Sequence, residues 1–308
     1  MWIMVIKSRT ERLVIVLFRY LNARMNLTDK EVNYYSNLIK GYEGEQKSDI
    51  WLNNLTDEWL VIHDLLLEYN HSKFQIDTLI IAHQKIYILD VKYLEGDHLI
   101  EGGQWYKVPK KQIQNPVEQL NRCEILLRKL LRELGFNYPI ESFLIFNNPE
   151  FLLYQPTINP AIINPAQLNR FLKKLNLNPV KLDKRYFKVA EQLVSLHQLE
   201  SPYPLLPKYN YEQLKKGILS PHCYSFYTEL RGGMLLCDDC GCTERVESAV
   251  LRCVTELRLL FPDRKITTKA ILEWCEIINS EKTIRRILGK HYKLVGSSIS
   301  SHYVPRNE

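Results

Sequence analysis

The stretch that most constrains the fold is FQIDTLIIAHQKIYILDVKY, which runs from Phe74 to Tyr93. Two runs within it, 75–81 and 86–92, are rich in β-branched and aromatic residues, and such residues favour strands. A short polar break at His83-Gln84 separates the two runs. The segment therefore predicts a β-hairpin.

The register of this hairpin decides what its polar residues can do. A loop of two or four residues sets Asp77 directly opposite Asp90, and opposed residues share a sheet face with Cβ atoms about 5 Å apart. Lys92 lies two residues beyond Asp90, so it points to the same face. Two carboxylates this close repel each other unless a cation or a shared proton joins them. This register favours a functional pair, whereas a three-residue loop would undo the pairing.

Four segments around the hairpin carry a family resemblance. They are Gly41-Tyr42-Glu43-Gly44-Glu45, Gln75-Ile76-Asp77, Asp90-Val91-Lys92 with Gly96 and Trp105 behind it, and Asn115-Pro116-Val117-Glu118-Gln119. In this order, from about Gly41 to Pro149, they resemble the nuclease-related domain called NERD, a branch of the PD-(D/E)xK nuclease superfamily. The chain departs from the family at Asp90, where glutamate is usual, and this shortens the side chain by one methylene.

The resemblance implies an α/β fold with a mixed central sheet flanked by helices. It also implies metal-dependent hydrolysis of phosphodiester bonds in DNA. Asp77, Asp90 and the backbone carbonyl of Val91 would bind Mg²⁺ or Mn²⁺, hard cations that prefer oxygen ligands. Lys92 would stabilise charge at phosphorus or lower the pKa of the attacking water. Glu45 would complete the metal shell or anchor it through water, and Gln119 would orient Lys92 or the water. The implied catalytic residues are Glu45, Asp77, Asp90, Lys92 and Gln119.

Two alternatives stay open at this point. The entry helix also offers Glu43, and Glu45 is preferred because Gly-Glu is the pair that recurs in the family. The nuclease-like core can also serve as the scaffold of a non-catalytic protein that binds DNA or RNA. Metal binding and cleavage by Asp77, Asp90 and Lys92 would separate the two functions.

Composition limits the class of protein and its compartment. No apolar run approaches the roughly 20 residues that cross a bilayer, and the apolar start is too short for a signal peptide. Seven cysteines are an odd number, which favours a reducing compartment over a disulfide framework. We therefore expect a cytoplasmic protein. Residues 1–40 carry seven Lys/Arg against three acids, and residues 205–308 carry sixteen against twelve. Both flanks suit a polyanionic partner, and an ordinary solvated surface is the alternative.

A cysteine cluster follows the proline-rich stretch Ser201–Pro207. Ser220-Pro221-His222-Cys223 and Cys237-Asp238-Asp239-Cys240-Gly241-Cys242 resemble a zinc ribbon in which Ser220 replaces one cysteine. Two C-x-x-C knuckles normally give four thiolates to one tetrahedral metal. The cluster either binds structural zinc or is a degenerate ribbon held by packing. The candidate zinc ligands are His222, Cys223, Cys237, Cys240 and Cys242.

The C-terminal segment predicts a compact helical module. Apolar spacing indicates a helix from Val246 to Leu260 and short helices at 268–277 and 281–288, followed by a hairpin around Gly296-Ser297-Ser298. This order resembles a winged helix-turn-helix. Its second short helix carries Arg285, Arg286 and Lys290, which suit contacts with phosphates or base edges. An ordinary charged helical face is the alternative.

These patterns divide the chain into consecutive segments. We expect an N-terminal helical extension at 1–40, the nuclease-like domain at 41–150, a helical extension and linker at 151–204, the ribbon-like module at 205–245 and the helical tail at 246–308. Helices are expected at Arg9–Arg24 and Tyr42–Asn54, the second burying Ile50, Trp51 and Leu55. His63, His71, His83 and His98 are expected at the surface or in turns.

Overall fold

The computed structural model describes residues 4–55, 59–82, 85–109, 111–154, 158–177, 182–199, 205–297 and 300–306. The predicted turn at His83-Gln84 and much of the proline-rich stretch lie outside these residues. The chain forms two compact units, Met1–Glu11 with Ser36–Ser201 and Arg12–Tyr35 with Pro202–Glu308. The first 40 residues are thus divided between the two units, and each unit is described separately below.

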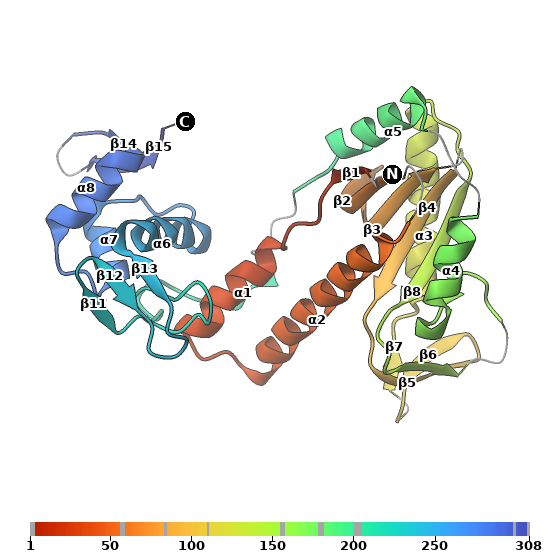
Figure 1. The fold of residues 1–308 in the computed structure, drawn as a ribbon, viewed down its shortest axis with the longest axis horizontal. Helices are drawn as coiled ribbons and strands as arrows, with labels where there is room; N and C mark the ends of the chain where they lie inside the picture. The colour runs from red at the N-terminus through yellow and green to blue at the C-terminus, as the bar shows by residue number, and fades with distance from the viewer. Residues whose placement is uncertain are drawn as a thin grey trace. The chain divides into compact units, whose positions relative to one another are not determined.

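The first unit is built on a mixed β-sheet (Figure 1). Its strands, in spatial order, are β1 (Met4–Lys7), β2 (Leu60–Tyr69), β3 (Ser72–Ala82), β4 (Lys85–Lys92), β8 (Ile140–Phe146) and β10 (Ile162–Ile163). The pairs β2–β3 and β3–β4 are antiparallel, whereas β1–β2, β4–β8 and β8–β10 are parallel. Parallel neighbours need a long crossover connection, and the one between β4 and β8 contains helix α3 (Pro116–Glu133).

Helices cover both faces of this sheet. On one face, Leu120 and Leu127 of α3 and Val189 of α5 (Lys184–Ser195) pack against inward residues such as Ile62 and Ile88. The other face is covered by Phe171 of α4 (Leu168–Leu175) and Leu52 of α2 (Asp29–Leu52), which pack with a second set that includes Ile80 and Leu89. Alternate strand residues point to opposite faces, so one strand supplies both cores. The structure confirms the predicted α/β class with a mixed sheet flanked by helices.

A smaller sheet and short elements complete the first unit. This sheet has the order β7 (Lys111–Ile113), β6 (Gln104–Lys107), β5 (Gly96–Glu101) and β9 (Phe151–Tyr154), and a 3-10 helix η1 (Pro165–Gln167) precedes α4. His98 lies in β5 and is only 1% exposed. Its ring centroid is 5.0 Å from that of Phe151. The expectation of a surface His98 is therefore wrong, because the strand turns it toward an aromatic neighbour.

The start of α3 agrees with its sequence signal. Asn115 caps the helix by accepting a hydrogen bond from the Val117 amide at 3.0 Å, and Pro116 occupies the first helical position. Gly135, with φ at 79°, follows the C-terminal end as predicted. These contacts fix the helix that carries Gln119.

Helix α2 differs from its prediction in both its length and its buried side. It begins at Asp29 instead of Tyr42, and it buries Gly44, Glu45, Ser48 and Leu52, whereas Ile50 is 68% exposed. The reason is local. A Cβ at Gly44 would overlap the Tyr93 side chain, so this glycine allows the helix to approach β4 with its polar side inward.

The second unit joins the two ends of the chain in one core. Helix α1 (Leu13–Arg24) places Leu17 and Leu21 against Trp274 and other core residues of the C-terminal part. That part contains β11 (Glu229–Arg231), β12 (Met234–Leu236), β13 (Thr243–Arg245), α6 (Val246–Leu260), α7 (Thr268–Cys275), α8 (Glu281–His291), β14 (Tyr292–Val295) and β15 (His302–Pro305). The helix expected to begin at Arg9 begins at Leu13, because Arg9 belongs to the first unit.

A buried ion pair connects α1 to this core. Arg24 donates to Glu256 from Nε at 2.6 Å and from Nη2 at 2.9 Å, and their side chains are 0% and 3% exposed. Arg24 also donates to the backbone carbonyls of Lys215 and Gly217, and its guanidinium lies 4.2 Å from the ring centroid of Trp274. The N-terminal helix is therefore an integral part of the second unit. No helix in the described part of the chain is long and apolar enough to cross a membrane.

Candidate active site and cysteine cluster

The β3–β4 pairing has the register that the sequence predicts. The ladder runs from Ala82 opposite Lys85 to Thr78 opposite Leu89. Asp77 and Asp90 are the next positions in order, just beyond the last pair. There the Val91 amide donates to Asp77 Oδ2 at 2.9 Å, so a carboxylate takes the place of a strand carbonyl. The hairpin thus brings the two aspartates together at the end of the ladder.

Asp90, Lys92 and Gln119 form a connected group. Lys92 Nζ donates to Asp90 Oδ1 at 2.7 Å and to Gln119 Oε1 at 3.5 Å. Burial lowers the pKa of Lys92, but the negative charges of Asp90 and Asp77 outweigh it and raise the pKa above its usual value. Lys92 therefore keeps its positive charge beside the aspartates. The α3 N-cap places Gln119 in the first turn, facing this lysine.

The carboxyl group of Asp90 is in an environment that opposes its charge. Burial, and then the neighbouring Asp77 carboxylate, raise the pKa of Asp90 to about 7, although Lys92 opposes both effects. Asp90 Oδ2 is buried and receives no hydrogen bond from the described residues. A divalent cation would satisfy this oxygen and relieve the repulsion from Asp77. The two carboxylates are therefore an arrangement that a divalent cation could join.

Glu45 is held by an arginine that the sequence patterns did not single out. Glu45 is 6% exposed, and its Oε2 accepts from Arg9 Nη1 at 2.6 Å, whereas Glu43 is exposed. The Arg9 side chain is 3% exposed and also donates to both oxygens of Asp49, at 2.8 and 3.1 Å. Arg9 lies outside every motif segment, so only the tertiary structure shows that it reaches this site.

His63 belongs to the same buried group, which corrects the expectation of a surface residue. It is 5% exposed, and its Nδ1 is 3.1 Å from Asp49 Oδ1 and 3.2 Å from Thr78 Oγ1. Burial lowers the pKa of His63, against the raising effect of Asp49. The neutral ring can therefore bridge Asp49 and Thr78. By contrast, His71 is fully exposed, and His83 lies outside the described residues.

The cysteine cluster forms a compact thiol site in the second unit. The sulfur atoms of Cys223, Cys237 and Cys240 lie within 4.8 Å of one another, and the Cys223 and Cys237 sulfurs are 3.5 Å apart. A tetrahedral zinc ion separates its thiolates by about 3.8 Å. In the part of the chain that the structure describes, this is the one group with three close His, Cys, Asp or Glu ligand atoms. The spacing fits a thiophilic metal.

Ser220 lies inside this cluster, at the position where a ribbon would have cysteine. It is fully buried, and its Oγ is 3.1 Å from the Cys242 sulfur and 3.5 Å from the Cys240 sulfur. Its hydrogen bonds lower the pKa of the thiols of Cys223, Cys240 and Cys242, whereas burial raises the pKa of Cys237. His222 is exposed and contacts Ser220 through its backbone amide. The structure therefore brings Cys242, and not the His222 ring, next to the group.

The predicted nucleic-acid contacts all lie on the exposed side of α8. Arg285 pairs with Glu281 at 2.6 Å, one turn earlier, and Lys290 pairs with Glu247 of α6 at 2.8 Å. Arg286 lines a hollow of about 700 Å³ together with Arg245 and residues of the β11–β12 turn. The three side chains share one helix, but two of them already have acidic partners.

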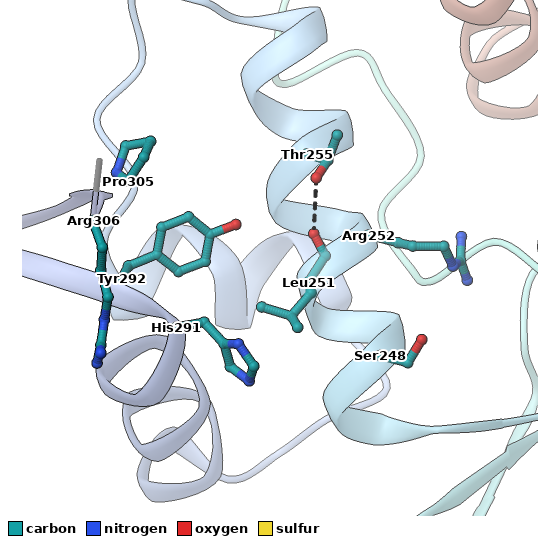
Figure 2. Close-up of a pocket in the computed structure, with 8 residues that line it drawn as sticks. All are labelled: Ser248, Leu251, Arg252, Thr255, His291, Tyr292, Pro305 and Arg306. Atoms are coloured by element: carbon teal, nitrogen blue, oxygen red, sulfur yellow. Dashed lines mark hydrogen bonds between the residues drawn. The ribbon is translucent and has the colours of Figure 1, made fainter. Parts of the chain in front are cut away.

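A second hollow in this unit offers no catalytic arrangement. It measures about 530 Å³ and lies between α6 and the β14–β15 hairpin (Figure 2). Arg252 points away from Tyr292 and His291 in this view. Arg252 pairs with the Glu244 carboxylate at 2.6 Å, and His291 Nε2 lies 2.6 Å from Glu247 Oε1. Two of its basic side chains thus have acidic partners, and Arg306 donates to the Gly289 carbonyl at 3.1 Å.

Comparison with known families agrees with the geometry of the first unit. The sequence model of the nuclease-related domain, NERD, matches residues 40–147. The match includes Glu45, both aspartates, Lys92 and Gln119, but neither Arg9 nor the cysteine cluster. No curated protein and no solved structure matches the chain.

Proposed function

Since residues 40–147 carry a nuclease-related domain, we propose that the first unit is a Mg²⁺- or Mn²⁺-dependent nuclease that hydrolyses phosphodiester bonds of DNA. One observation carries the proposal. Asp90 Oδ2 is buried without a hydrogen-bond donor among the described residues, and it faces a second carboxylate, Asp77. A buried carboxyl group in this state, beside a half-buried second one, is poorly explained by packing alone, because desolvated charge is costly.

Each residue of the proposed site would have a distinct role in the reaction. Asp77, Asp90 and the Val91 carbonyl would hold the cation, which when bound supplies charge neutralisation and Lewis-acid activation at the phosphate. Lys92, which keeps its positive charge, stabilises the negative charge that develops on the phosphoryl oxygens. Gln119 accepts a hydrogen bond from Lys92 and limits its rotation. Glu45 contributes negative charge at the edge of the site.

A non-catalytic, nucleic-acid-binding scaffold is the second candidate function. It is favoured by the contact between Lys92 and Asp90 at 2.7 Å, which already neutralises one ligand. In either function, the second unit would add phosphate contacts through Arg285, Arg286 and Lys290. Such contacts weaken as salt rises, because binding releases counterions from the nucleic acid.

One experiment separates the two functions. The full chain is incubated with labelled duplex DNA, single-stranded DNA and RNA, in Mn²⁺, Mg²⁺ or EDTA, and cleavage and binding are measured on the same samples. Cleavage of DNA that requires the cation and stops in EDTA supports the nuclease. Salt-sensitive binding without cleavage in any cation supports the scaffold. If an Arg285→Glu/Arg286→Glu variant binds nucleic acid as tightly as wild type, α8 does not contribute to the binding.

For the second unit, we propose structural zinc held by Cys223, Cys237 and Cys240 with Cys242 as the fourth ligand. The support is the spacing of the sulfurs and the contact of Ser220 with Cys242 at 3.1 Å. Thiolates bind the metal, and hydrogen bonds that lower thiol pKa values favour this form. Ser220 would then donate to a thiolate and not coordinate the ion.

The zinc proposal predicts about one zinc per chain, measured by elemental analysis of protein purified without added metal. The Cys237→Ser variant should lose the metal, and its second unit should melt at a lower temperature, because structural zinc contributes folding free energy. Ser220→Ala is the matched control and should retain zinc, since only a hydrogen bond is removed. The proposal would be contradicted if wild-type protein contained no zinc after purification and a chelator left its melting temperature unchanged.

A further inference from the structure

Asp77 has no paired residue in either of the two strands next to β3. In the β2–β3 ladder, His63 pairs with Thr78 and Leu65 pairs with Ile76, so Asp77 has no partner there. The β3–β4 ladder ends at Thr78. Asp64, which would oppose Asp77, has a φ of 52°, and this marks the irregularity. Without another contact, the main chain of Asp77 would lack the hydrogen bonds that usually fix a strand residue.

Arg9 supplies that contact. Its Nη2 donates to the Asp77 carbonyl at 2.8 Å and to Thr78 Oγ1 at 3.2 Å. Through the same guanidinium, Nη1 reaches Glu45 at 2.6 Å, and Nε and Nη2 reach Asp49. A planar guanidinium with five donors can join a strand carbonyl to carboxylates on a helix in one fixed geometry.

The two sides of Asp77 are therefore held by different partners. Arg9 fixes its carbonyl, and the Val91 amide fixes its carboxylate at 2.9 Å. Arg9 also fixes Glu45, so a single side chain connects two acids of the site that come from β3 and α2. Arg9 lies outside the segment that matches the family, 40–147, and just before the chain enters the second unit at Arg12.

We propose that Arg9 is a positioning residue, which holds Asp77 and Glu45 in the arrangement that receives the divalent cation. Its charge also compensates Glu45 and Asp49, which would otherwise repel the aspartates. The metal-binding part of the proposal rests on the proposed function, whereas the positioning of Asp77 is independent of it. A buried arginine that served stability alone would leave cation affinity unchanged.

The first measurement needs no metal. Hydrogen exchange of the Val91 amide reports its bond to Asp77, and selective labelling of valine allows NMR to follow it in the full chain. In Arg9→Met, Val91 should exchange at least about tenfold faster relative to the other amides of β4, because local opening becomes easier. Unchanged relative protection at Val91 would overturn the proposal, whatever the enzyme does.

The second measurement titrates Mn²⁺ and follows the melting temperature. Arg9→Met should weaken the apparent Mn²⁺ affinity by about 10- to 100-fold, the usual effect of removing a group that orients a metal ligand. Arg9→Lys should show a smaller loss in the same direction, since an ammonium cannot form the same fork, and it serves if Arg9→Met fails to fold.

Lys7→Met is the matched control. Lys7 lies on the same segment and donates to the carbonyls of His63 and Asp64, but to no carboxylate of the site. It should lower the melting temperature while leaving the Mn²⁺ affinity and Val91 exchange unchanged. Equal Mn²⁺ affinities in wild type, Arg9→Lys and Arg9→Met would contradict the role toward the cation. A wild type without any Mn²⁺ response would instead refute the proposed function, and Val91 exchange would still decide the positioning of Asp77.

Discussion

Asp90→Asn is expected to abolish Mn²⁺-dependent cleavage of DNA, by about 10³-fold or more, while nucleic-acid affinity stays within about threefold. The substitution keeps the shape of the side chain but removes the charge that would hold the cation. The proposed phosphate contacts, Arg285, Arg286 and Lys290, lie in the second unit and would carry most of the affinity. Initial rates on labelled duplex DNA, with affinity measured in EDTA, check both parts.

Asp90→Glu is the control for this experiment. It restores the acid that the family usually carries and keeps the charge, so cleavage should persist at a measurable rate. Asp90→Asn should not destabilise the fold, because it replaces a buried acid whose pKa is raised to about 7 with a neutral isostere. Cleavage by Asp90→Asn at the wild-type rate would show that the phosphodiester chemistry, if present, lies at another site.

Arg24→Met is expected to destabilise the second unit by about 3–5 kcal/mol, which is the cost of leaving a buried charge without its partner. Glu256 is 3% exposed and would lose both hydrogen bonds from Arg24. The two units have separate hydrophobic cores, so we expect urea denaturation to show a transition of the second unit shifted to lower urea while that of the first is retained.

Two further variants make this result specific to the buried pair. Arg24→Met/Glu256→Gln should recover part of the lost stability, because no unpaired charge remains. Arg285→Met breaks the exposed pair with Glu281, whose side chains are 67% and 57% exposed, and should change stability by less than about 1 kcal/mol. If Arg24→Met behaves like Arg285→Met, α1 is not held in this core by its ion pair.

The parts of the fold that could be predicted are those whose signals are local. Runs rich in β-branched and aromatic residues and a short polar break indicate the β3–β4 hairpin and its register, and Asn115-Pro116 indicates the start of α3. Asp77, Asp90 and Lys92 could be placed together because strand geometry alone fixes their spacing. The register holds as far as Thr78 and Leu89.

The errors arose where tertiary contacts outweigh local pattern. The apolar residues of α2 predicted a buried Ile50, but Gly44 packs close to Tyr93, and the buried side of the helix carries Glu45 instead. His63 was expected at the surface, and it is buried because Asp49 and Thr78 offer it polar partners. Arg9 has no local signal at all, since its partners lie 36 or more positions away.

The packing of α1 shows the same limit. The amphipathic pattern of α1 predicts a packing face but not the element that it packs against. Its partner is the C-terminal core, and the buried bond between Arg24 and Glu256 spans 232 positions. Spacing along the sequence carries no information on a pairing of that length.

The central claim is that Asp77 and Asp90 bind a divalent cation, and melting of the full chain with and without Mn²⁺ tests it most directly. The pKa of Asp90 is raised to about 7 in the folded protein, against about 3.9 for an unperturbed aspartate. Without metal, this group stabilises the fold below about pH 4, and the contribution is lost as pH rises through about 7. Mn²⁺ should therefore stabilise the protein mainly near pH 8, where both carboxylates are charged.

The comparison is between wild type and Asp90→Asn at about pH 5 and about pH 8. Both proteins carry the same cysteine cluster, so any metal binding there cancels in the difference. The account predicts that Mn²⁺ raises the melting temperature of wild type far more at pH 8 than at pH 5, and that Asp90→Asn lacks this extra stabilisation. An equal Mn²⁺ response of the two proteins at pH 8 would contradict it.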